Sequence, residues 1–282
     1  MKIGIIGSNG FIGSNVYNSL KKNSFYKVIK FSSYKKLKKD WIKKVSDEIK
    51  IFKPNIIINC AAYQDLTENK KSIKYHLNSN LFSYIFFLNQ ATNYSSFKGY
   101  INFGTKWEFD KKGNFQPLNF YAATKHACDN YLQYFSQKKN IVTISLKIFD
   151  TYGKNDKRKK FLNSLIKSYK NNKSLNVTHG NQYLDFVHID DLTNLVFKIC
   201  EDIKKKKLEG FNFFTVSSKQ PIKLKFLVKK LQSSLKKNLK VKIGAKKYRV
   251  NESMQYVKKI KNYPGWKTKI NFFPEIIKIF DN

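Results

Sequence analysis

KIGIIGSNGFIGSNVYNSLKK, residues 2–22, joins a short apolar run to a longer amphipathic stretch. The apolar run has the composition of a buried β-strand, and the stretch after it has the apolar spacing of a helix. Gly7, Gly10 and Gly13 stand between the two. The first glycine permits a tight turn, the second lets a phosphate approach the backbone, and the third lets the helix pack closely on the strand. The stretch therefore predicts a strand, a phosphate-binding turn and a helix whose N-terminus faces the phosphate.

The residues between these glycines belong to the same predicted site. Asn9, Phe11 and Ile12 fill the turn, so we expect them to contact the same ligand. The spacing G-x-x-G-x-x-G differs from the G-x-G-x-x-G of ordinary dinucleotide dehydrogenases. A glycine turn that serves packing alone is the alternative, and the turn by itself leaves it open.

The same order of apolar run and amphipathic stretch recurs along the first half of the chain. Such runs are YKVIKF, NIIINCAA, GYINFGT and IVTISLKIF. This order predicts an α/β fold, a Rossmann-type doubly wound parallel sheet with helices on both faces. We expect residues 1–150 to form the dinucleotide-binding Rossmann domain, to which a strand and a helix around 181–215 return. Residues 151–180 and 216–282 should form a small C-terminal substrate-binding cap.

The net charge of +36 raises the question of a nucleic-acid partner. Nearly all of this charge is lysine, and arginine occurs only at Arg158 and Arg249. Lysine, asparagine, isoleucine, phenylalanine and tyrosine share A- and T-rich codons, so a biased genome would produce the same profile. The lysines are also spread over the whole length. The charge therefore indicates a general attraction to anionic small molecules, and we expect no specific nucleic-acid partner.

The cellular compartment follows from what the sequence lacks. No run reaches the roughly 18 apolar residues of a membrane span, and the N-terminus has no signal-peptide core. Cys60, Cys128 and Cys200 have neither the spacing of metal ligands nor that of a disulfide framework. We therefore expect a cytoplasmic protein with no membrane partner and no metal, whose cysteines serve as small apolar residues.

The end of the second predicted strand, VIKFSSYKK, bears on the choice of dinucleotide. An acidic residue here would hold the ribose 2′-hydroxyl of NAD, and this stretch has none. Ser32 and Ser33 can donate hydrogen bonds, and Lys35 can neutralise a 2′-phosphate. The stretch therefore favours NADP(H). NAD(H) stays possible, because lysine is common everywhere in this chain.

The stretch NFYAATKHACDNYL, residues 119–132, places a tyrosine and a lysine one helical turn apart. Tyr121 and Lys125 would lie on the same face of a helix. A nearby ammonium favours the phenolate and makes the phenol a better acid. The alternative is a chance pair on a helix surface.

With GSNGFIG near the N-terminus and YAATK at position 121, the chain resembles the extended short-chain dehydrogenase/reductase family, that of the NAD-dependent epimerases and dehydratases. NCAA, HLNSN, LKIFDTYG and YLDFVHIDDL are similar to further motifs of the family. The resemblance implies that Cys60, Ala61 and Ala62 lie against the cofactor. It also implies that Asn80 steadies the active site and is one of the cofactor-binding residues.

The resemblance assigns Thr105, Tyr121 and Lys125 as the catalytic residues. Tyr121 would deliver a proton to a sugar ketone while Thr105 hydrogen-bonds the same oxygen. Lys125 would also hold the nicotinamide ribose. Relatives commonly form dimers through two long helices, so a homodimer is possible.

The branch of the family depends on the residues after Thr105. Dehydratases carry Asp-Glu there, and this chain has Lys106 and Trp107, which argues against elimination of water. YRVNESMQYVKKIKNYPGWK is similar to the reductases of the CDP-abequose and CDP-paratose synthase type. The resemblance therefore implies an NADP-dependent reductase of a nucleotide-activated 4-keto-6-deoxysugar in surface polysaccharide biosynthesis.

The predicted substrate-binding residues are Lys106, Trp107, Asp150 and Arg249. Arg249 matches a diphosphate-binding position, and a planar guanidinium suits phosphate. Two departures leave the nucleotide open: Leu184 replaces a family arginine, and Asp150 replaces a family asparagine. An NAD-dependent sugar-nucleotide epimerase is the first alternative function. A non-catalytic nucleotide- or RNA-binding protein on the same fold is the second.

Overall fold

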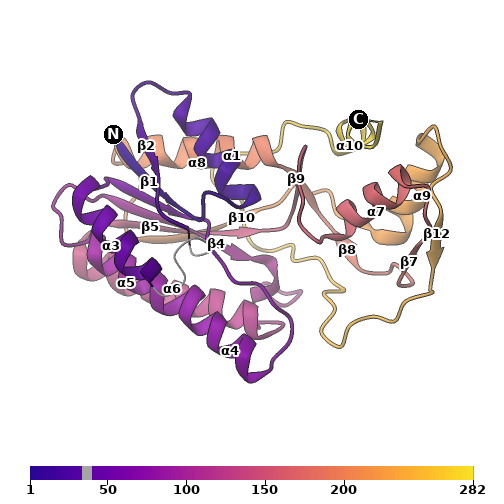
Figure 1. The fold of residues 1–282 in the computed structure, drawn as a ribbon, viewed down its shortest axis with the longest axis horizontal. Coiled ribbons are helices and arrows are strands. Elements are labelled where there is room, and N and C mark those ends of the chain that lie inside the picture. Colours follow the sequence, from indigo (N-terminus) through magenta and orange to yellow (C-terminus); the bar gives the residue numbers. More distant parts are fainter. Residues whose placement is uncertain (34–39, 282) are drawn as a thin grey trace.

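A computed structural model describes residues 1–33 and 40–281 of the chain. Its centre is a six-stranded parallel sheet (Figure 1), which confirms the predicted Rossmann-type α/β fold. The strands, in spatial order, are β2 (Lys27–Lys30), β1 (Lys2–Ile6), β3 (Ile56–Asn59), β4 (Gly99–Thr105), β5 (Val142–Ile148) and β10 (Phe211–Val216). The order reverses at β1, because the chain passes to β2 on one side and then crosses to β3 on the other. Ligands of doubly wound sheets bind in the crevice at such a reversal.

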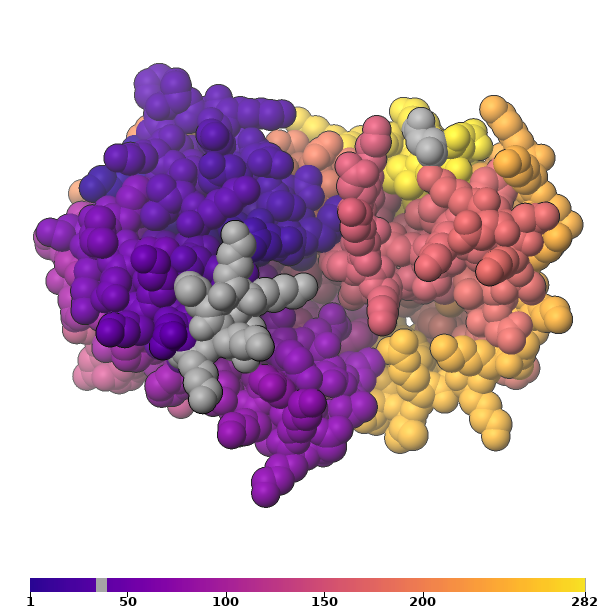
Figure 2. Space-filling view, in the orientation of Figure 1, coloured from indigo at the N-terminus to yellow at the C-terminus, as the bar shows by residue number. Residues whose placement is uncertain are grey.

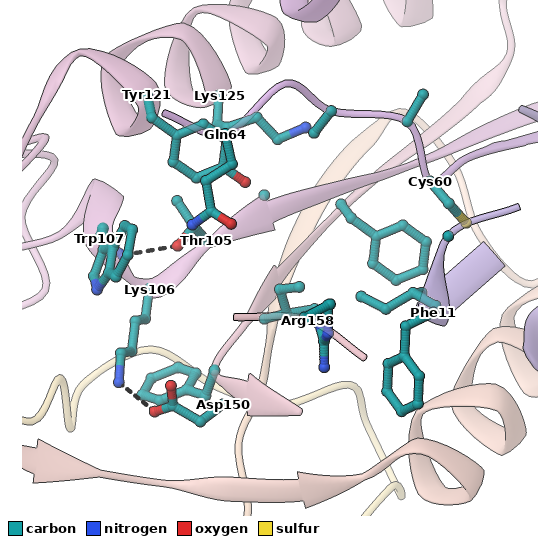
Figure 3. A pocket seen from close by; sticks show the side chains of 18 of the residues that line it. Phe11, Cys60, Gln64, Thr105, Lys106, Trp107, Tyr121, Lys125, Asp150 and Arg158 are labelled. Atoms are coloured by element: carbon teal, nitrogen blue, oxygen red, sulfur yellow. Dashed lines mark hydrogen bonds and ion pairs between the residues drawn. The ribbon is translucent and has the colours of Figure 1, made fainter. Parts of the chain in front are cut away.

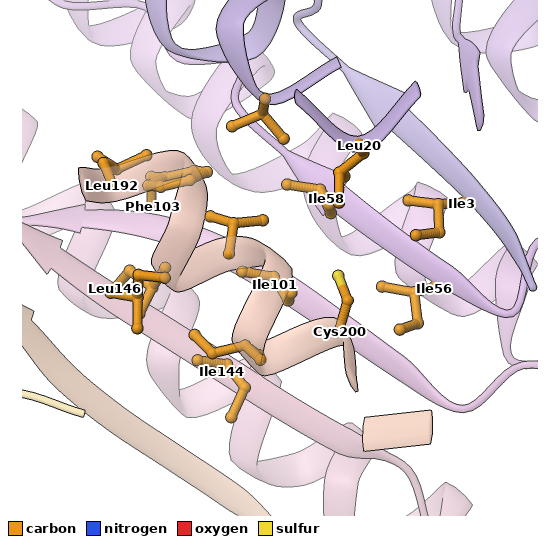
Figure 4. Packing of buried hydrophobic residues seen from close by; sticks show 14 of the residues in the cluster. Ile3, Leu20, Ile56, Ile58, Ile101, Phe103, Ile144, Leu146, Leu192 and Cys200 are labelled. Atoms are coloured by element: carbon orange, nitrogen blue, oxygen red, sulfur yellow. The ribbon is translucent and has the colours of Figure 1, made fainter. Parts of the chain in front are cut away.

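Helices cover both faces of this sheet (Figure 1). Helices α1 (Phe11–Lys21) and α8 (Ile189–Lys204) pack on one face, and α3 (Trp41–Phe52), α5 (Ser83–Ala91) and α6 (Phe120–Lys139) pack on the other. Successive strand residues point to opposite faces, so Ile56 and Ile58 join the first cluster (Figure 4) while Ile57 joins the second. Burial on both faces explains why these strands read as continuous apolar runs.

The second half of the chain adds elements at the carboxyl ends of the strands. Strands β6 (Asp150–Tyr152) and β9 (Phe186–His188) pair beside the main sheet. Beyond them lie α7 (Phe161–Lys170), β7 (Leu175–Val177), β8 (Tyr183–Leu184), β11 (Ile222–Lys223), α9 (Leu224–Ser234), β12 (Val241–Ile243) and α10 (Phe272–Asp281). They share an apolar cluster of their own, which includes Leu165, Leu227 and Phe280. In Figure 2 this part lies beside the indigo and purple N-terminal part.

Strand β10 returns to the main sheet from this second half, and α8 packs against α1. The functional division into a dinucleotide-binding domain and a substrate-binding cap stays a prediction. None of the helices in residues 1–33 and 40–281 is both long enough and apolar enough to cross a bilayer.

Candidate active site

A cavity of about 200 Å³ opens at the carboxyl ends of β1, β3, β4 and β5 (Figure 3). Most of the residues predicted from the sequence line it together. They are Gly10, Phe11, Ile12, Gly13, Cys60, Ala61, Ala62, Thr105, Lys106, Trp107, Tyr121, Lys125 and Asp150. The predicted residues outside this lining are Gly7, Asn9, Ser32, Ser33, Asn80 and Arg249. Lys35 lies outside the described residues.

The three glycines of the first turn meet different surroundings. A Cβ on Gly7 would lie 2.5 Å from the backbone nitrogen of Ala61, and one on Gly13 would lie 2.3 Å from the carbonyl oxygen of Gly7. A Cβ on Gly10 would find its nearest protein atom at 3.4 Å, so packing does not require glycine there. Gly10 instead leaves room in the cavity.

The start of α1 suits a phosphate group. Gly10 is its N-cap and provides no side-chain cap, and the first turn carries no acidic residue. The N–H groups of this turn therefore keep their partial positive charge, and Gly10 leaves the space a phosphate needs. The turn and the strand end at Cys60–Ala62 fit the pyrophosphate of a dinucleotide.

The side-chain contacts at the end of β2 differ from those that its sequence predicted. The backbone N–H of Ser32 donates to Oε2 of Glu48 at 2.7 Å, and the Ser32 hydroxyl donates to Oε1 of the same carboxylate. An acid thus reaches the end of the second strand from α3, although the strand itself has none. Sequence reasoning missed it because the acid lies sixteen residues further along the chain.

The catalytic residues predicted by resemblance come from two elements. Thr105 ends β4, and Tyr121 and Lys125 lie in the first turns of α6. Helix α6 begins at this point because the side chain of Asn119 accepts the N–H of Ala122 at 2.9 Å. Tyr121 and Lys125 point from one face of α6 into the cavity, and Thr105 lines the same cavity at the end of β4 (Figure 3).

Burial governs the protonation of this pair. It raises the pKa of the Tyr121 phenol, and the charge of Glu108 raises it further. Burial lowers the pKa of the Lys125 ammonium. The direction for Tyr121 is opposite to the depressed pKa that a tyrosine–lysine pair suggested. Tyr121 therefore holds its proton at neutral pH, which is the state a proton donor needs.

Lys106 and Asp150 form an ion pair at the cavity, with Nζ 2.6 Å from Oδ2 (Figure 3). Burial alone would raise the pKa of Asp150, but the charges of Lys106 and Lys160, together with hydrogen bonds from Lys106 and the backbone of Asp185, lower it. Asp150 is therefore ionised, and its two cationic neighbours explain how an acid is tolerated in a site suited to anions. Trp107 packs edge-on against the Tyr121 ring, with centroids 6.3 Å apart.

Several lining residues were missed in the sequence. They are Gln64, Phe103, Gly104, Ile148, Phe149, Arg158 and Lys160. For Arg158 a signal existed, since it is one of only two arginines in a lysine-rich chain. Sequence reasoning chose the other, Arg249, whose side chain is exposed.

The guanidinium of Arg158 is held in place by protein groups. Its Nε and Nη2 donate to the two carboxylate oxygens of Asp156 at 2.8 and 2.7 Å. Nη2 also donates to the carbonyl oxygen of Thr151 at 2.9 Å. The guanidinium lies over the Phe11 ring, 4.4 Å from its centroid, next to the start of α1. The Nε–Nη2 edge of the guanidinium is therefore occupied by Asp156 and Thr151, and Nη1 is the nitrogen left to donate to a phosphate.

Asn80 supports the cavity without lining it. Its side chain accepts the N–H of Tyr63 at 2.8 Å and donates to the Tyr63 carbonyl at 3.0 Å. It also donates to the Thr124 hydroxyl at 3.2 Å. Asn80 thus ties the segment after β3 to α6, while direct contact with a cofactor stays a prediction.

Comparison with known proteins identifies the family of this chain. The family model described as "NAD dependent epimerase/dehydratase family" matches residues 3–212. The chain belongs to the NAD-dependent epimerase/dehydratase family. This confirms the resemblance drawn from the glycine turn and the YAATK motif.

Curated relatives of this family member cover most of its length. CDP-abequose synthase of Yersinia pseudotuberculosis is 25% identical, over 96% of this chain and 96% of the relative. Protein CapI of Staphylococcus aureus is 24% identical, over 84% of each chain. Among solved structures, a UDP-glucuronic acid 4-epimerase from Bacillus cereus, a Y149F mutant with a fluorinated UDP-sugar and NAD, has a TM-score of 0.82 at 18% identity. It covers 100% of this chain and 98% of its own.

Proposed function

We propose that this family member is a reductase that delivers a hydride to the ketone of a nucleotide-activated 4-keto-6-deoxysugar, in surface polysaccharide biosynthesis. One observation carries the proposal: Thr105, Tyr121 and Lys125 line one cavity with the glycine turn of α1. The similarity to CDP-abequose synthases over nearly the full length supports the substrate class.

The side chains around the ketone have different roles in the proposed reaction. A nicotinamide dinucleotide, when bound, supplies the hydride. Tyr121 donates its phenolic proton to the ketone oxygen, and the buried ammonium of Lys125 stabilises the phenolate left behind. The oxygen of Thr105 accepts the N–H of Trp107 at 3.3 Å, so its hydroxyl proton is free to donate to the same ketone oxygen.

Elimination of water is disfavoured by the carboxylates near the cavity. A dehydratase needs an acid and a base beside the reacting sugar carbons. Among the described residues that line the cavity, Asp150 is the one carboxylate, and Lys106 holds it in an ion pair. Glu108, three residues after Thr105, is buried outside the lining. These positions support reduction over dehydration.

The dinucleotide is proposed to be NADPH, because Ser33 and the lysine-rich sequence after it suit a 2′-phosphate, although both donors of Ser32 are taken by Glu48. The carboxylate of Glu48 beside Ser32 favours NADH instead, since a negative charge there repels a 2′-phosphate. An epimerase that keeps NAD bound remains the second candidate function, favoured by the same carboxylate.

A substrate panel separates these functions. We expect the purified protein to oxidise NADPH when CDP-, GDP-, UDP- or dTDP-linked 4-keto-6-deoxysugars are supplied. The loss of absorbance at the nicotinamide band measures this oxidation. The same panel with NADH measures the cofactor preference. Interconversion of sugar-nucleotide epimers without net cofactor oxidation would show the epimerase instead and overturn the reductase.

The two arginines give a direct test of the phosphate site. We propose that Arg158 and Lys160 contact the substrate diphosphate, because both line the cavity and the guanidinium is fixed over Phe11. Arg158→Gln should weaken binding of the nucleoside diphosphate about 10- to 100-fold, as expected for loss of a charge-assisted hydrogen bond. Calorimetric titration with CDP, GDP, UDP and dTDP measures this.

Arg249→Gln is the matched comparison, because it removes the other arginine of the chain from an exposed site. A larger loss of affinity in Arg249→Gln than in Arg158→Gln would contradict the role of Arg158. It would support Arg249 as the diphosphate-binding residue, as the sequence predicted.

A further inference from the structure

A buried ion cluster lies behind the cavity wall and joins three elements. Lys147 of β5 places its ammonium 2.5 Å from Oδ2 of Asp129 on α6 and forms a second ion pair with Oε2 of Glu108. The side chains of Lys147 and Glu108 are fully buried, and that of Asp129 is 4% exposed. None of the three lines the cavity.

Glu108 connects this cluster to the predicted catalytic threonine. Its second oxygen, Oε1, accepts the backbone N–H of Thr105 at 2.7 Å. The Thr105 hydroxyl oxygen accepts the N–H of Trp107 in return, which makes a capping box around the short 3₁₀ turn η3 (Lys106–Glu108). Glu108 therefore fixes the backbone at Thr105, while the N–H of Trp107 in the same turn holds the Thr105 hydroxyl oxygen.

Asp129 connects the cluster to the helix of the tyrosine. It lies one helical turn beyond Lys125 on α6, and Tyr121 lies one turn before Lys125. Lys147 thus ties the turn that carries Thr105 to the helix that carries Tyr121 and Lys125.

The surroundings of the cluster are shaped for it. A Cβ on Gly104 would lie 2.6 Å from Oε1 of Glu108 and 2.7 Å from Cδ of Lys147, so glycine makes the room. Glu108, Asp129 and His126 lie close enough together to hold a metal ion, but the ammonium of Lys147 already contacts both carboxylates. Well-packed apolar side chains of similar volume would stabilise the fold about as well as this buried ion cluster does. Stability alone therefore does not explain why charged residues occupy these positions.

We infer that Glu108, Lys147 and Asp129 are positioning residues that fix Thr105 relative to Tyr121. The inference rests on the proposed function, because it gives Thr105 and Tyr121 their roles at the ketone. Glu108 acts through Thr105 and does not touch the substrate.

A double-mutant cycle tests this role. Glu108→Gln removes the charge that Lys147 holds, and we expect kcat to fall about 10- to 100-fold while the Kd for NADPH and the KM stay within threefold. The same change in a Thr105→Val background should have little further effect, because the group that Glu108 positions is already absent. Equal losses in the two backgrounds would show a general structural effect and overturn the inference.

Two further measurements keep the test decisive. Glu209→Gln, at an exposed site after α8, is the matched control and should leave kcat unchanged. Hydrogen exchange of the segment 103–109 needs no substrate: Glu108→Ala should expose the Thr105 amide to faster exchange. An unchanged rate there overturns the positioning role, whereas absence of ketosugar reduction in the wild type overturns only the proposed reaction.

Discussion

Tyr121→Phe should lower kcat for ketosugar reduction by about 10²- to 10⁴-fold, the range for loss of a positioned general acid. The phenol lines the cavity beside Lys125, and burial keeps its pKa above the ordinary value, so the wild type enters each turnover with a proton to donate. Phenylalanine keeps the ring that packs against Trp107 and removes only the hydroxyl. Steady-state rates with saturating NADPH measure the effect.

Tyr131→Phe on the same helix is the matched control. Its side chain is 41% exposed and does not line the cavity, so the rate should match that of the wild type. The Kd for NADPH should stay within about threefold in both variants, because the hydroxyl is needed for proton transfer more than for binding. A Tyr121→Phe rate within tenfold of the wild type would contradict the proton-donor role.

The parts of this site that the sequence could predict are those in which neighbours along the chain are neighbours in space. Gly13 begins the helix that follows the first strand, so its close approach to Gly7 follows from local spacing. Tyr121 and Lys125 are one helical turn apart, and helix geometry alone places both on the same face. Alternation of strands and helices likewise predicts a parallel sheet whose strand ends converge.

Contacts made by side chains from distant segments could not be predicted in the same way. Glu48 reaches the end of β2 from α3, which reverses the charge that the local pattern VIKFSS suggested. Lys106 and Asp150 meet because β4 and β5 are adjacent and each ends at the same edge. Composition favoured neither Arg158 nor Arg249, and only the fold places the former at the cavity.

Lys147→Met should lower the free energy of unfolding by about 3 to 5 kcal/mol, the range for removing one partner from a buried ion pair. Methionine fills a similar volume, so little of the loss comes from a cavity. The loss comes from Glu108 and Asp129, whose carboxylates would face each other with no cation between them. Urea denaturation followed by circular dichroism measures it, with Lys138→Met at an exposed site of α6 as the control.

The loss in Lys147→Met should also depend on pH. Burial raises the pKa of Glu108 from an ordinary 4.5 to about 7 even with Lys147 present, and without that ammonium the pKa rises further. A carboxyl with a raised folded-state pKa binds more protons when folded, so its contribution to stability falls as pH rises above 4.5. The variant should therefore lose more stability at pH 8 than at pH 5.

Adding Glu108→Gln and Asp129→Asn to Lys147→Met should recover part of the loss, because neutral amides need no cation. The recovery should be larger at pH 8 than at pH 5, since at low pH the Glu108 carboxyl of the single variant already holds a proton. A loss in Lys147→Met that is the same at both pH values would mean that packing, and not the unpaired carboxylates, sets the stability of this layer between β5 and α6. In that case packing would connect the turn of Thr105 to helix α6, and the charges of the three residues would not set the stability of this connection.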